Sequence, residues 1–352
     1  MAWENLSLAP ARLLALRFSA DQVGQLSTIG FHRGRQDLFL RQLPELLQAM
    51  RQRALIESAE SSSRIEGVTA PRERVEAIVA GGARPANRPE AEIAGYRAGL
   101  DLVHESGTDM PFTANVMLLL HSHLFRQVEG APHGWKRADN VILEHTADGG
   151  TRVRFRPVAA NQTADAVAAL VAHHAAANAA GQAPLIVAPL AILDFLCIHP
   201  FTDGNGRVSR LLTLMLLYAA GLQVGRYISL ERIVEDSKER YYLALQRSSS
   251  GWHEGTHDVA PWLDYFWAMV VRAYVELEDR VGTLRAGRGA KTEMVRRAVA
   301  RRFAAFGIAD LERDCPGVSR EMVRRVLRAL RAEGKITQQG HGRGATWAPK
   351  TR

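Results

Sequence analysis

The segment HPFTDGNGRVSR, residues 199–210, decides how the rest of the sequence is interpreted. It begins with His199, a side chain that can accept a proton near neutral pH. The Gly-Asn-Gly run that starts at Gly204 can place successive backbone N–H groups around an anion, because glycine adopts positive φ without steric cost. The segment therefore combines a base with an anion-binding turn.

A helix is predicted from Arg207 to Leu217, because this stretch is rich in leucine and free of Gly and Pro. Its N-terminus would direct free N–H groups and the positive end of the helix dipole at the same anion. Arg207 and Arg210 lie three positions apart, which predicts that both guanidinium groups share one helix face. Asp203 would hold Mg²⁺ that bridges phosphate oxygens, since a carboxylate repels phosphate itself. Together these features predict attack of a hydroxyl on a bound nucleotide phosphate.

Every fixed position of the segment matches the pattern H-x-F-x-[DE]-G-N-G-R-x-x-R, and the chain therefore resembles the Fic family. The resemblance implies transfer of AMP from ATP to a hydroxyl side chain of a target protein. It makes His199 the general base, Asp203 the Mg²⁺ ligand and Phe201 the anchor of the loop. The nucleotide phosphates would be bound by Gly204, Asn205, Gly206, Arg207 and Arg210. The related Doc branch carries a lysine at the position of Gly206, so the glycine favours AMP transfer. The alternative is an ordinary turn with solvated arginines, and the number of matched positions argues against it.

A second segment, residues 62–67, resembles the inhibitory pattern [ST]-x-x-x-E-[GN] of self-restrained Fic proteins. The resemblance implies that Glu66, at the end of a helix before Gly67, pairs with Arg210 where the γ-phosphate of ATP would bind. Ser62 lies four positions earlier and shares the helix face of Glu66. Taken alone, the segment is equally a helix end capped by Gly67 with a solvated glutamate. Beside the first motif, the inhibitory interpretation is favoured.

Two further regions resemble parts of the family more weakly. Alternating apolar residues around the Gly-Gly pair at 149–150 predict a β-hairpin. In the family such a flap adds a strand to the target, and Val141 and Ile142 would dock it. The alternative is an ordinary surface hairpin. Tyr241 and Tyr242 resemble the region that lines the adenine pocket, although the asparagine expected before them is missing. Their alternative role is packing against the core with both hydroxyls at its rim.

Length and composition predict a mainly α-helical protein of two or three domains. The chain has 352 residues, and the windows 46–59, 164–177 and 262–281 show helical periodicity. The expected fold is a Fic helical bundle with a small β-hairpin flap. The longest apolar runs have about 14 residues, short of the ~18–20 that span a bilayer. With two cysteines and no secretory leader evident, we expect a cytoplasmic location, no membrane partner and, from the resemblance, a homodimer.

Positive charge is concentrated at the C-terminus. Residues 285–352 contain 17 Lys or Arg and 6 Asp or Glu, a net charge of +11, whereas the rest of the chain has a net charge of −3. The pattern predicts helices at 293–306 and 308–313, then a helix that is capped by Ser319 and ends at Gly334, then a hairpin. This order resembles a winged helix-turn-helix. Its charge favours salt-dependent contacts with DNA phosphates, and docking of a protein is the alternative.

The predicted organisation has three parts: an N-terminal helical region at 1–110 with the inhibitory helix, a catalytic core at 111–284, and the winged helix-turn-helix at 285–352. The predicted function is a protein adenylyltransferase that uses ATP and Mg²⁺ and is held inactive by Glu66. The alternative, from another class of protein, is a DNA-binding regulator whose Fic core senses nucleotide or is an inactive passenger. The intact His199 argues against a silent core.

Overall fold

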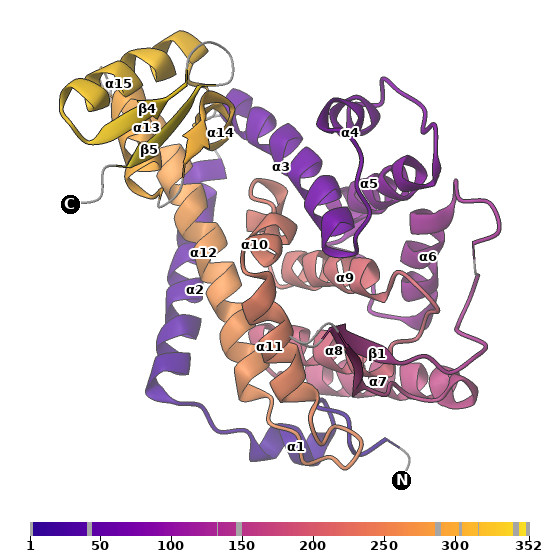
Figure 1. The fold of residues 1–352 in the computed structure, drawn as a ribbon. Coiled ribbons are helices and arrows are strands. Elements are labelled where there is room, and N and C mark those ends of the chain that lie inside the picture. Colours follow the sequence, from indigo (N-terminus) through magenta and orange to yellow (C-terminus); the bar gives the residue numbers. More distant parts are fainter. Residues whose placement is uncertain are drawn as a thin grey trace. The chain divides into compact units, whose positions relative to one another are not determined.

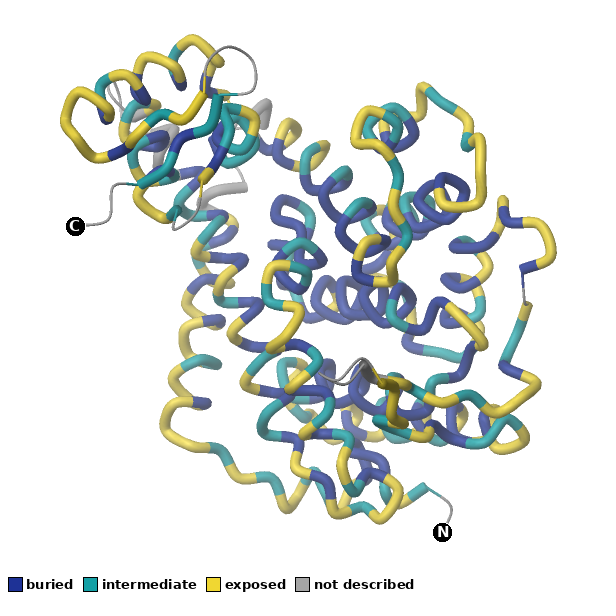
Figure 2. Tube along the Cα trace, in the orientation of Figure 1, coloured by how far each residue is buried: buried dark blue, intermediate teal, exposed yellow. Residues whose placement is uncertain are grey.

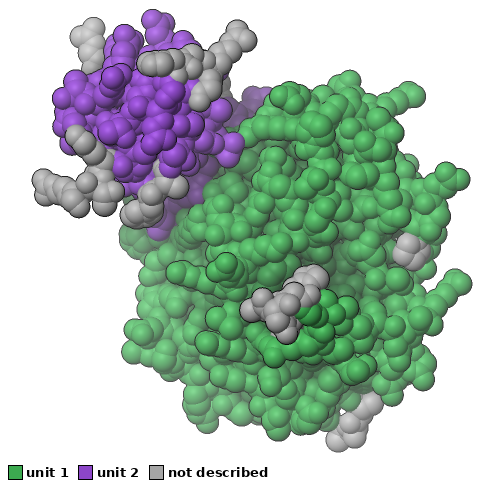
Figure 3. All heavy atoms as spheres, viewed as in Figure 1, with its two compact units in different colours: residues 1–36, 51–273 green, residues 37–50, 274–352 purple. Residues whose placement is uncertain are grey.

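The computed structural model describes residues 3–40, 44–131, 133–145, 150–285, 290–302, 305–315, 317–340 and 345–349. Helices dominate these residues, as composition and periodicity predicted, and the strands form one small two-stranded and one small three-stranded sheet (Figure 1). The chain divides into two compact units, Met1–Gln36 with Arg51–Ala273 and Asp37–Met50 with Tyr274–Arg352 (Figure 3). The domain boundaries predicted after residues 110 and 284 stay predictions.

Three long helices contribute residues to both units: α2 (Ala20–Leu40), α3 (Pro44–Ile65) and α12 (Ala260–Arg285). The other helices of the first unit are α1 (Pro10–Ala15), α4 (Arg72–Val79), α5 (Arg88–Ser106), α6 (Ala114–Phe125), α7 (Thr163–Ala179), α8 (Pro184–Ile198), α9 (Asn205–Ala219), α10 (Leu230–Asp236) and α11 (Lys238–Ser249), with short 3₁₀ turns at Ala160–Gln162 and Val224–Arg226. The three windows of predicted helical periodicity lie within α3, α7 and α12, which confirms them as helices.

Helices α8 and α9 form the centre of the first unit. Both are buried on nearly every side, which requires that neighbouring elements cover them all round. Helices α5, α6 and α8 pack against α9, and α7 covers α8 (Figure 1). The buried positions make α9 dark blue over most of its length in Figure 2. The loop between α8 and α9 therefore joins two helices that are packed in the core.

Within the described part of the chain, no helix is both long and apolar enough to cross a membrane.

Capping side chains fix where α5 and α6 begin. The Asn87 side-chain oxygen accepts a hydrogen bond from the Glu90 N–H at 3.0 Å, and Thr113 Oγ1 accepts one from the Val116 N–H at 3.3 Å. Such caps satisfy N–H groups that have no partner within the helix, and each stabilises the helix by about 1 kcal/mol. These caps therefore set the register of α5 and α6 as they pack against α9.

The predicted β-hairpin is present as β1 (Ile142–His145) and β2 (Thr151–Phe155). The strands are antiparallel, with Leu143 opposite Val153, and the register shifts next to Ile142. Of the predicted Gly-Gly turn, Gly149 lies outside the described residues. Strand β2 of the hairpin packs against α11. Residues of the hairpin and of the α8–α9 loop line the same pocket.

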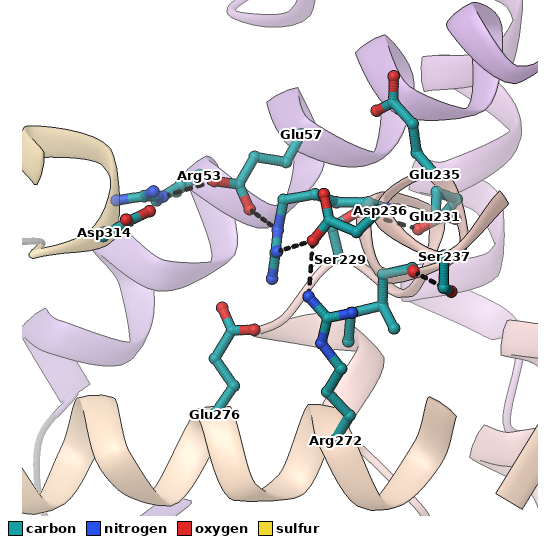
Figure 4. Close-up of polar contacts among 12 residues, drawn as sticks. Arg53, Glu57, Ser229, Glu231, Glu235, Asp236, Ser237, Arg272, Glu276 and Asp314 are labelled. Carbon is teal, nitrogen blue, oxygen red and sulfur yellow. Dashed lines mark hydrogen bonds and ion pairs between the residues drawn. The ribbon is translucent and has the colours of Figure 1, made fainter. Parts of the chain in front are cut away.

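Polar contacts fasten α3 to its neighbours in the first unit. Figure 4 shows a chain of alternating charges in which Glu57 of α3 accepts from Arg53 at 2.7 Å and lies 3.3 Å from Arg232 of α10. Arg232 in turn pairs with Asp236 at 3.0 Å, and Asp236 pairs with Arg272 of α12 at 2.7 Å. This network holds the C-terminal half of α3 in a defined position.

A second set of contacts holds α3 nearer its C-terminal end. Ser58 donates to the buried Glu231 at 2.6 Å, and Arg64 pairs with Glu235 at 2.7 Å. Buried hydrogen bonds to a charged carboxylate are worth about 1.5–3 kcal/mol each, more than exposed ion pairs. The end of α3 is therefore fixed in the first unit.

The second unit contains the C-terminal elements α13 (Ala290–Ala300), β3 (Phe306–Gly307), α14 (Ile308–Asp314), α15 (Arg320–Ala332), β4 (Ile336–Gln339) and β5 (Thr346–Pro349), and its strand order is β3-β5-β4. Ser319 caps α15 by accepting from the Met322 N–H at 3.3 Å, as predicted. The helix predicted for 293–306 is too long, because Phe306 pairs with Trp347 in the sheet and is buried there. The order of elements is consistent with the predicted winged helix-turn-helix, which stays a prediction.

Candidate active site

His199 lies where α8 ends, in a backbone conformation that is rare for residues other than glycine. Its φ is +52°, and its N–H donates to the Phe195 carbonyl at 2.9 Å. Gly204, with φ of +83°, then turns the chain into α9. A strained residue of this kind persists only where the surrounding structure holds it, and such residues concentrate at functional sites. The conformation presents the imidazole of His199 to a pocket.

The loop is held by an amide side chain from the first turn of α9. Asn205 is buried; its Oδ1 accepts from the Phe201 N–H at 2.9 Å, and its Nδ2 donates to the Phe201 carbonyl at 2.8 Å. Because the Asn205 side chain is used in this way, its backbone N–H is the group left to bind a phosphate. Phosphate binding at Asn205 stays a prediction, which the main chain rather than the side chain would fulfil.

Phe201 and a histidine from α6 anchor the other side of the loop. The Phe201 ring is fully buried and stacks on His121 with ring centroids 3.9 Å apart, and His121 Nε2 lies 3.1 Å from the Asp203 carbonyl oxygen. Burial lowers the pKa of His121 to about 4, so it is neutral at physiological pH. The ring can then donate one N–H to the loop. The predicted anchoring role of Phe201 is thus present.

Lys136 is a second brace, which the sequence did not reveal. It is buried, its N–H donates to the Pro200 carbonyl at 2.9 Å, and its Nζ donates to the Ile198 carbonyl at 3.2 Å. Burial lowers the pKa of Lys136 to about 8. The sequence does not indicate that a single lysine ahead of a predicted strand binds the carbonyl groups of the residues before and after a histidine.

The imidazole of His199 is held in its neutral form. Burial lowers the pKa of His199 to about 4, and the positive charge of Lys136 acts in the same direction. Above pH 4 the ring is therefore neutral, with a free lone pair that can accept a proton. Burial therefore keeps His199 neutral rather than a permanent cation.

Glu66 and Arg210, which the sequence analysis paired across a long stretch of chain, lie in direct contact. Arg210 Nη2 donates to Glu66 Oε1 at 2.8 Å, and Arg210 Nε donates to Ser62 Oγ at 2.8 Å. Gly67 follows in a left-handed conformation, with φ of +79°, and ends the helix. Burial acts to raise the pKa of Glu66, but the attraction of Arg210 outweighs it and the net shift is downward. The ion pair is therefore complete at neutral pH.

Gly206 gives Glu66 the space to reach Arg210. A Cβ at Gly206 would lie 2.2 Å from Glu66 Oε1 and 3.3 Å from Arg210 Nη1. Any side chain at this position would push the glutamate out of its place. The glycine of the nucleotide motif is thus also a steric requirement of the Glu66 contact.

We predict that Gly206→Ala lowers the free energy of unfolding by about 1–3 kcal/mol, as overpacking does. In a Glu66→Gly background the same change should instead stabilise by up to about 1 kcal/mol, because alanine is the better helix former. Urea unfolding of four proteins measures both effects: wild type, Gly206→Ala, Glu66→Gly and the double variant. Gly24→Ala in α2, where an added Cβ meets no described atom within 4 Å, is the control and should be insensitive to residue 66. Equal effects of Gly206→Ala in both backgrounds would contradict the prediction.

The Asp203 carboxylate is accessible to solvent. Its side chain is 50% exposed, and one oxygen accepts from the Gly204 N–H at 2.5 Å. No group of three or more potential His, Cys, Asp or Glu ligands occurs in the described ranges. Mg²⁺ is commonly held by one or two carboxylates plus substrate phosphates rather than by a protein cage, so a single exposed carboxylate fits it.

The two motif arginines do not share a partner, although their spacing suggested a common face. Arg210 faces Glu66, whereas the Arg207 side chain is only 1% exposed and its Nη1 donates to Glu92 Oε2 of α5 at 2.5 Å. A carboxylate just after α3 and another in α5 thus decide where the arginines point. Phosphate binding by Arg207 stays a prediction that requires it to turn from Glu92.

A pocket of about 690 Å³ lies between the α8–α9 loop, the hairpin and α11, all within the first unit. Its size is typical of a site for a small molecule or nucleotide. The predicted site residues that line it are Glu66, Ile142, His199, Gly206, Arg210, Tyr241 and Tyr242. The predicted residues outside its lining are Ser62, Gly67, Val141, Asp203, Gly204, Asn205 and Arg207. The pocket therefore brings together the proposed base, the paired arginine and both tyrosines.

Two cations of the pocket were missed by the sequence analysis. The guanidinium of Arg154, in β2, lies 5.4 Å from the centre of the Tyr242 ring, and Lys238 Nζ lies 5.8 Å from it. Tyr241 is buried against Trp262 and is closer to the alternative role of core packing. The hairpin was predicted from its alternating apolar residues, and nothing in that pattern indicates that Arg154 lies beside the pocket.

Comparison with known proteins agrees with this geometry. The sequence profile of the Fic/DOC family matches residues 111–217. No curated protein matches the chain. Among solved structures, a Fic family protein from Desulfovibrio desulfuricans is 20% identical with a TM-score of 0.59, and the alignment covers 96% of this chain and 98% of that one.

Two other structures have the same fold. A Fic domain-containing signaling protein from Bacteroides thetaiotaomicron has a TM-score of 0.60 at 20% identity, over 72% of this chain and 97% of that one. Fic-1 from C. elegans has a TM-score of 0.55 at 19% identity, over 73% of each chain. With the loop geometry, the profile match identifies residues 111–217 of this protein as a Fic/DOC family domain.

Proposed function

We propose that this protein is a protein adenylyltransferase that transfers AMP from ATP to a hydroxyl side chain of a target protein. Members of the Fic family commonly transfer AMP to proteins. The observation that carries the proposal is the neutral, strained His199 in the pocket beside the N-terminus of α9. His199 would take the proton of the target hydroxyl as its oxygen bonds to the α-phosphorus. The bond to the β-phosphate oxygen breaks, and pyrophosphate leaves.

The chain's own groups can stabilise the charge of this reaction. The first turn of α9 offers backbone N–H groups that have no partner within the helix, including that of Gly206. Arg210 would bind the outer phosphates once it is free of Glu66. Mg²⁺ held by Asp203 would neutralise charge on the phosphates. Tyr242 would contact the nucleoside, since it lines the pocket beyond these groups.

We further propose that Glu66 inhibits the reaction by taking the place of the γ-phosphate on Arg210. Arg210 Nη2 is paired with Glu66 at 2.8 Å, and Arg210 Nε is bound to Ser62. These two contacts occupy one edge of the guanidinium. The hairpin would supply the target-docking edge, since β1 pairs with β2 on one side and Val141 is 43% exposed beside it. An extended target segment can add to such an edge by main-chain pairing.

The test is incorporation of label from α-labelled ATP, with Mg²⁺, into the protein itself and into cell lysate. Wild type, Glu66→Gly and Glu66→Gly/His199→Ala are compared. Label that increases with Glu66→Gly and is lost with the second change supports the proposal. Absence of label in every variant would contradict it and favour the DNA-binding regulator.

That second candidate is supported by the surface of α15. Its apolar residues Val323, Val326, Leu327 and Leu330 are buried. Arg324, Arg325 and Arg328 are exposed on the same helix. Arginines in such an array can contact DNA phosphates, and each such contact makes binding more sensitive to salt.

We predict that the full-length protein binds duplex DNA with an affinity that falls steeply with salt. Replacing Arg324 and Arg328 by Ala should reduce the slope of log K against log[salt] by up to about 2. Fluorescence anisotropy at several salt concentrations measures the slope. Arg297→Ala, at a residue paired with Glu293 at 3.3 Å, is the control. Binding that is unaffected by salt, or an unchanged slope in the double variant, would argue for a protein-docking role.

A further inference from the structure

Arg207 is enclosed in a charge network that the proposed reaction does not explain. Its side chain is only 1% exposed, and its guanidinium lies 5.0 Å from the centre of the Phe125 ring. One end of the guanidinium, Nη1, donates to Glu92 at 2.5 Å. A buried arginine needs such a partner, since an unpaired charge in the interior costs several kcal/mol.

The other end of the same guanidinium faces the proposed Mg²⁺ ligand. Arg207 Nη2 lies 3.4 Å from Asp203 Oδ1 and 3.5 Å from Oδ2. The guanidinium is a rigid plane, so the contact at Nη1 fixes the position of Nη2. Arg207 therefore bridges Glu92 and Asp203.

Glu92 comes from outside the segment that matches the family profile. It is on α5, is 4% exposed, and its other oxygen accepts from Arg88 Nε at 2.9 Å. Helix α5 packs directly against α9, so the backbone holds Glu92 beside Arg207. The negative charge of Glu92 offsets the positive charge that Arg207 places next to Asp203.

We propose that Glu92 is a positioning residue that restricts Arg207 to long contacts of 3.4 and 3.5 Å with the Asp203 carboxylate, and so keeps Asp203 available for the Mg²⁺ of a bound nucleotide. Without Glu92, Arg207 would pair fully with Asp203 and its charge would repel the cation. The proposal rests on the proposed function only in requiring that the pocket binds Mg²⁺ with ATP. It makes Glu92 act through Arg207, with no contact to the substrate.

The experiment measures ATP binding rather than transfer. The reference protein is Glu66→Gly/His199→Ala, in which the proposed chemistry and inhibition are both removed. Isothermal titration gives the affinity for ATP across a series of Mg²⁺ concentrations and in EDTA. Adding Glu92→Gln should raise the Mg²⁺ concentration for half-maximal enhancement roughly tenfold, the lower end of the effect of residues behind metal ligands. Affinity in EDTA should stay unchanged.

Glu90→Gln is the matched control. Glu90 is on the same helix, is also 4% exposed, and is paired with Arg74 at 2.6 Å, away from the motif. It should leave the Mg²⁺ dependence unchanged while losing a comparable ion pair. An equal shift in Glu90→Gln, or an equal loss of ATP affinity in EDTA, would show a merely structural role and overturn the proposal.

A double change keeps the test decisive if Glu92→Gln alone unfolds the protein. Arg207→Gln/Glu92→Gln removes both charges, which avoids an uncompensated buried cation. Because Glu92 acts through Arg207, this double variant should need no more Mg²⁺ than Arg207→Gln alone. A further increase would overturn the proposal. A reference protein that binds no ATP would refute the proposed function as well, whereas binding with no shift in Glu92→Gln refutes only this inference.

Discussion

Replacing His199 by Ala in a Glu66→Gly background is expected to lower AMP transfer by roughly 10²–10⁴-fold, the contribution typical of a general base. The reason is that the hydroxyl of the target must lose its proton as it attacks, and His199 is the neutral base in the pocket. Initial rates of label transfer from α-labelled ATP measure the effect. The derepressed background is needed so that inhibition does not hide the loss.

The pKa of His199 sets the pH dependence that we expect for the reaction. Because burial lowers the pKa of His199 to about 4, the base stays unprotonated as pH falls from 8 to 5. The acid limb of kcat/KM, which reports the free enzyme, should therefore lie near pH 4 and not near the ordinary histidine value of about 6.5.

Controls separate chemistry from folding in this experiment. His199→Ala should bind ATP as tightly as the background protein, since the imidazole is assigned to the target hydroxyl. His253→Ala is the matched control and should retain activity, because His253 Nε2 donates to the Arg156 carbonyl at 2.7 Å and His253 does not line the pocket. Transfer that persists within a few-fold of the background after His199→Ala would rule out the assigned base.

Glu66→Gly is expected to raise AMP transfer by roughly 5–150-fold, which corresponds to a regulatory coupling of 1–3 kcal/mol. In the structure the carboxylate holds Arg210 through a bond of 2.8 Å, and removing it frees the guanidinium for a phosphate. Arg210 keeps its hydrogen bond to Ser62, so its orientation is preserved. Rates of label incorporation and ATP affinity, measured on the same preparations, test the coupling.

Two further variants define what Glu66 contributes. Glu66→Gln keeps the shape of the side chain but removes its charge, and it should activate less than Glu66→Gly if both charge and bulk inhibit. Glu60→Gln removes a carboxylate of the same helix that pairs with Arg64 at 2.5 Å, outside the pocket, and should leave transfer at the wild-type level. Equal rates for wild type and Glu66→Gly would exclude an inhibitory role.

Acid should not release Glu66 within the physiological range. Its pKa is lowered from the usual value of 4.5, despite burial, by the attraction of Arg210. A carboxyl with a depressed pKa keeps its stabilising contact above the usual range and loses it only as pH falls through the lower value. Mild acidification therefore does not release Arg210 from Glu66. A competing ligand or a movement of α3 would be needed to break the pair.

The sequence by itself determined the parts of this protein that depend on local chemistry. The order of residue types in 199–210 predicted the loop and the helix after it, because turns and helix starts are set by neighbouring residues. Alternation predicted the hairpin, and Ser319 predicted the start of α15. The helix predicted to reach Phe306 was wrong at that end. Phe306 is in a strand, because pairing with Trp347 in the sheet outweighs the helical periodicity of the local sequence.

Only the tertiary structure decided which groups the active-site arginines meet. Glu92 is 115 residues from Arg207, and nothing in local spacing marks it among the glutamates of α5. Glu66 is 144 residues from Arg210, and its pairing was anticipated only through resemblance to a known pattern. Contacts over such separations depend on how α3 and α5 pack around α9, so the charge around the motif is a property of the folded protein. That is why the sequence predicted two arginines on one face, whereas the fold directs each to its own carboxylate.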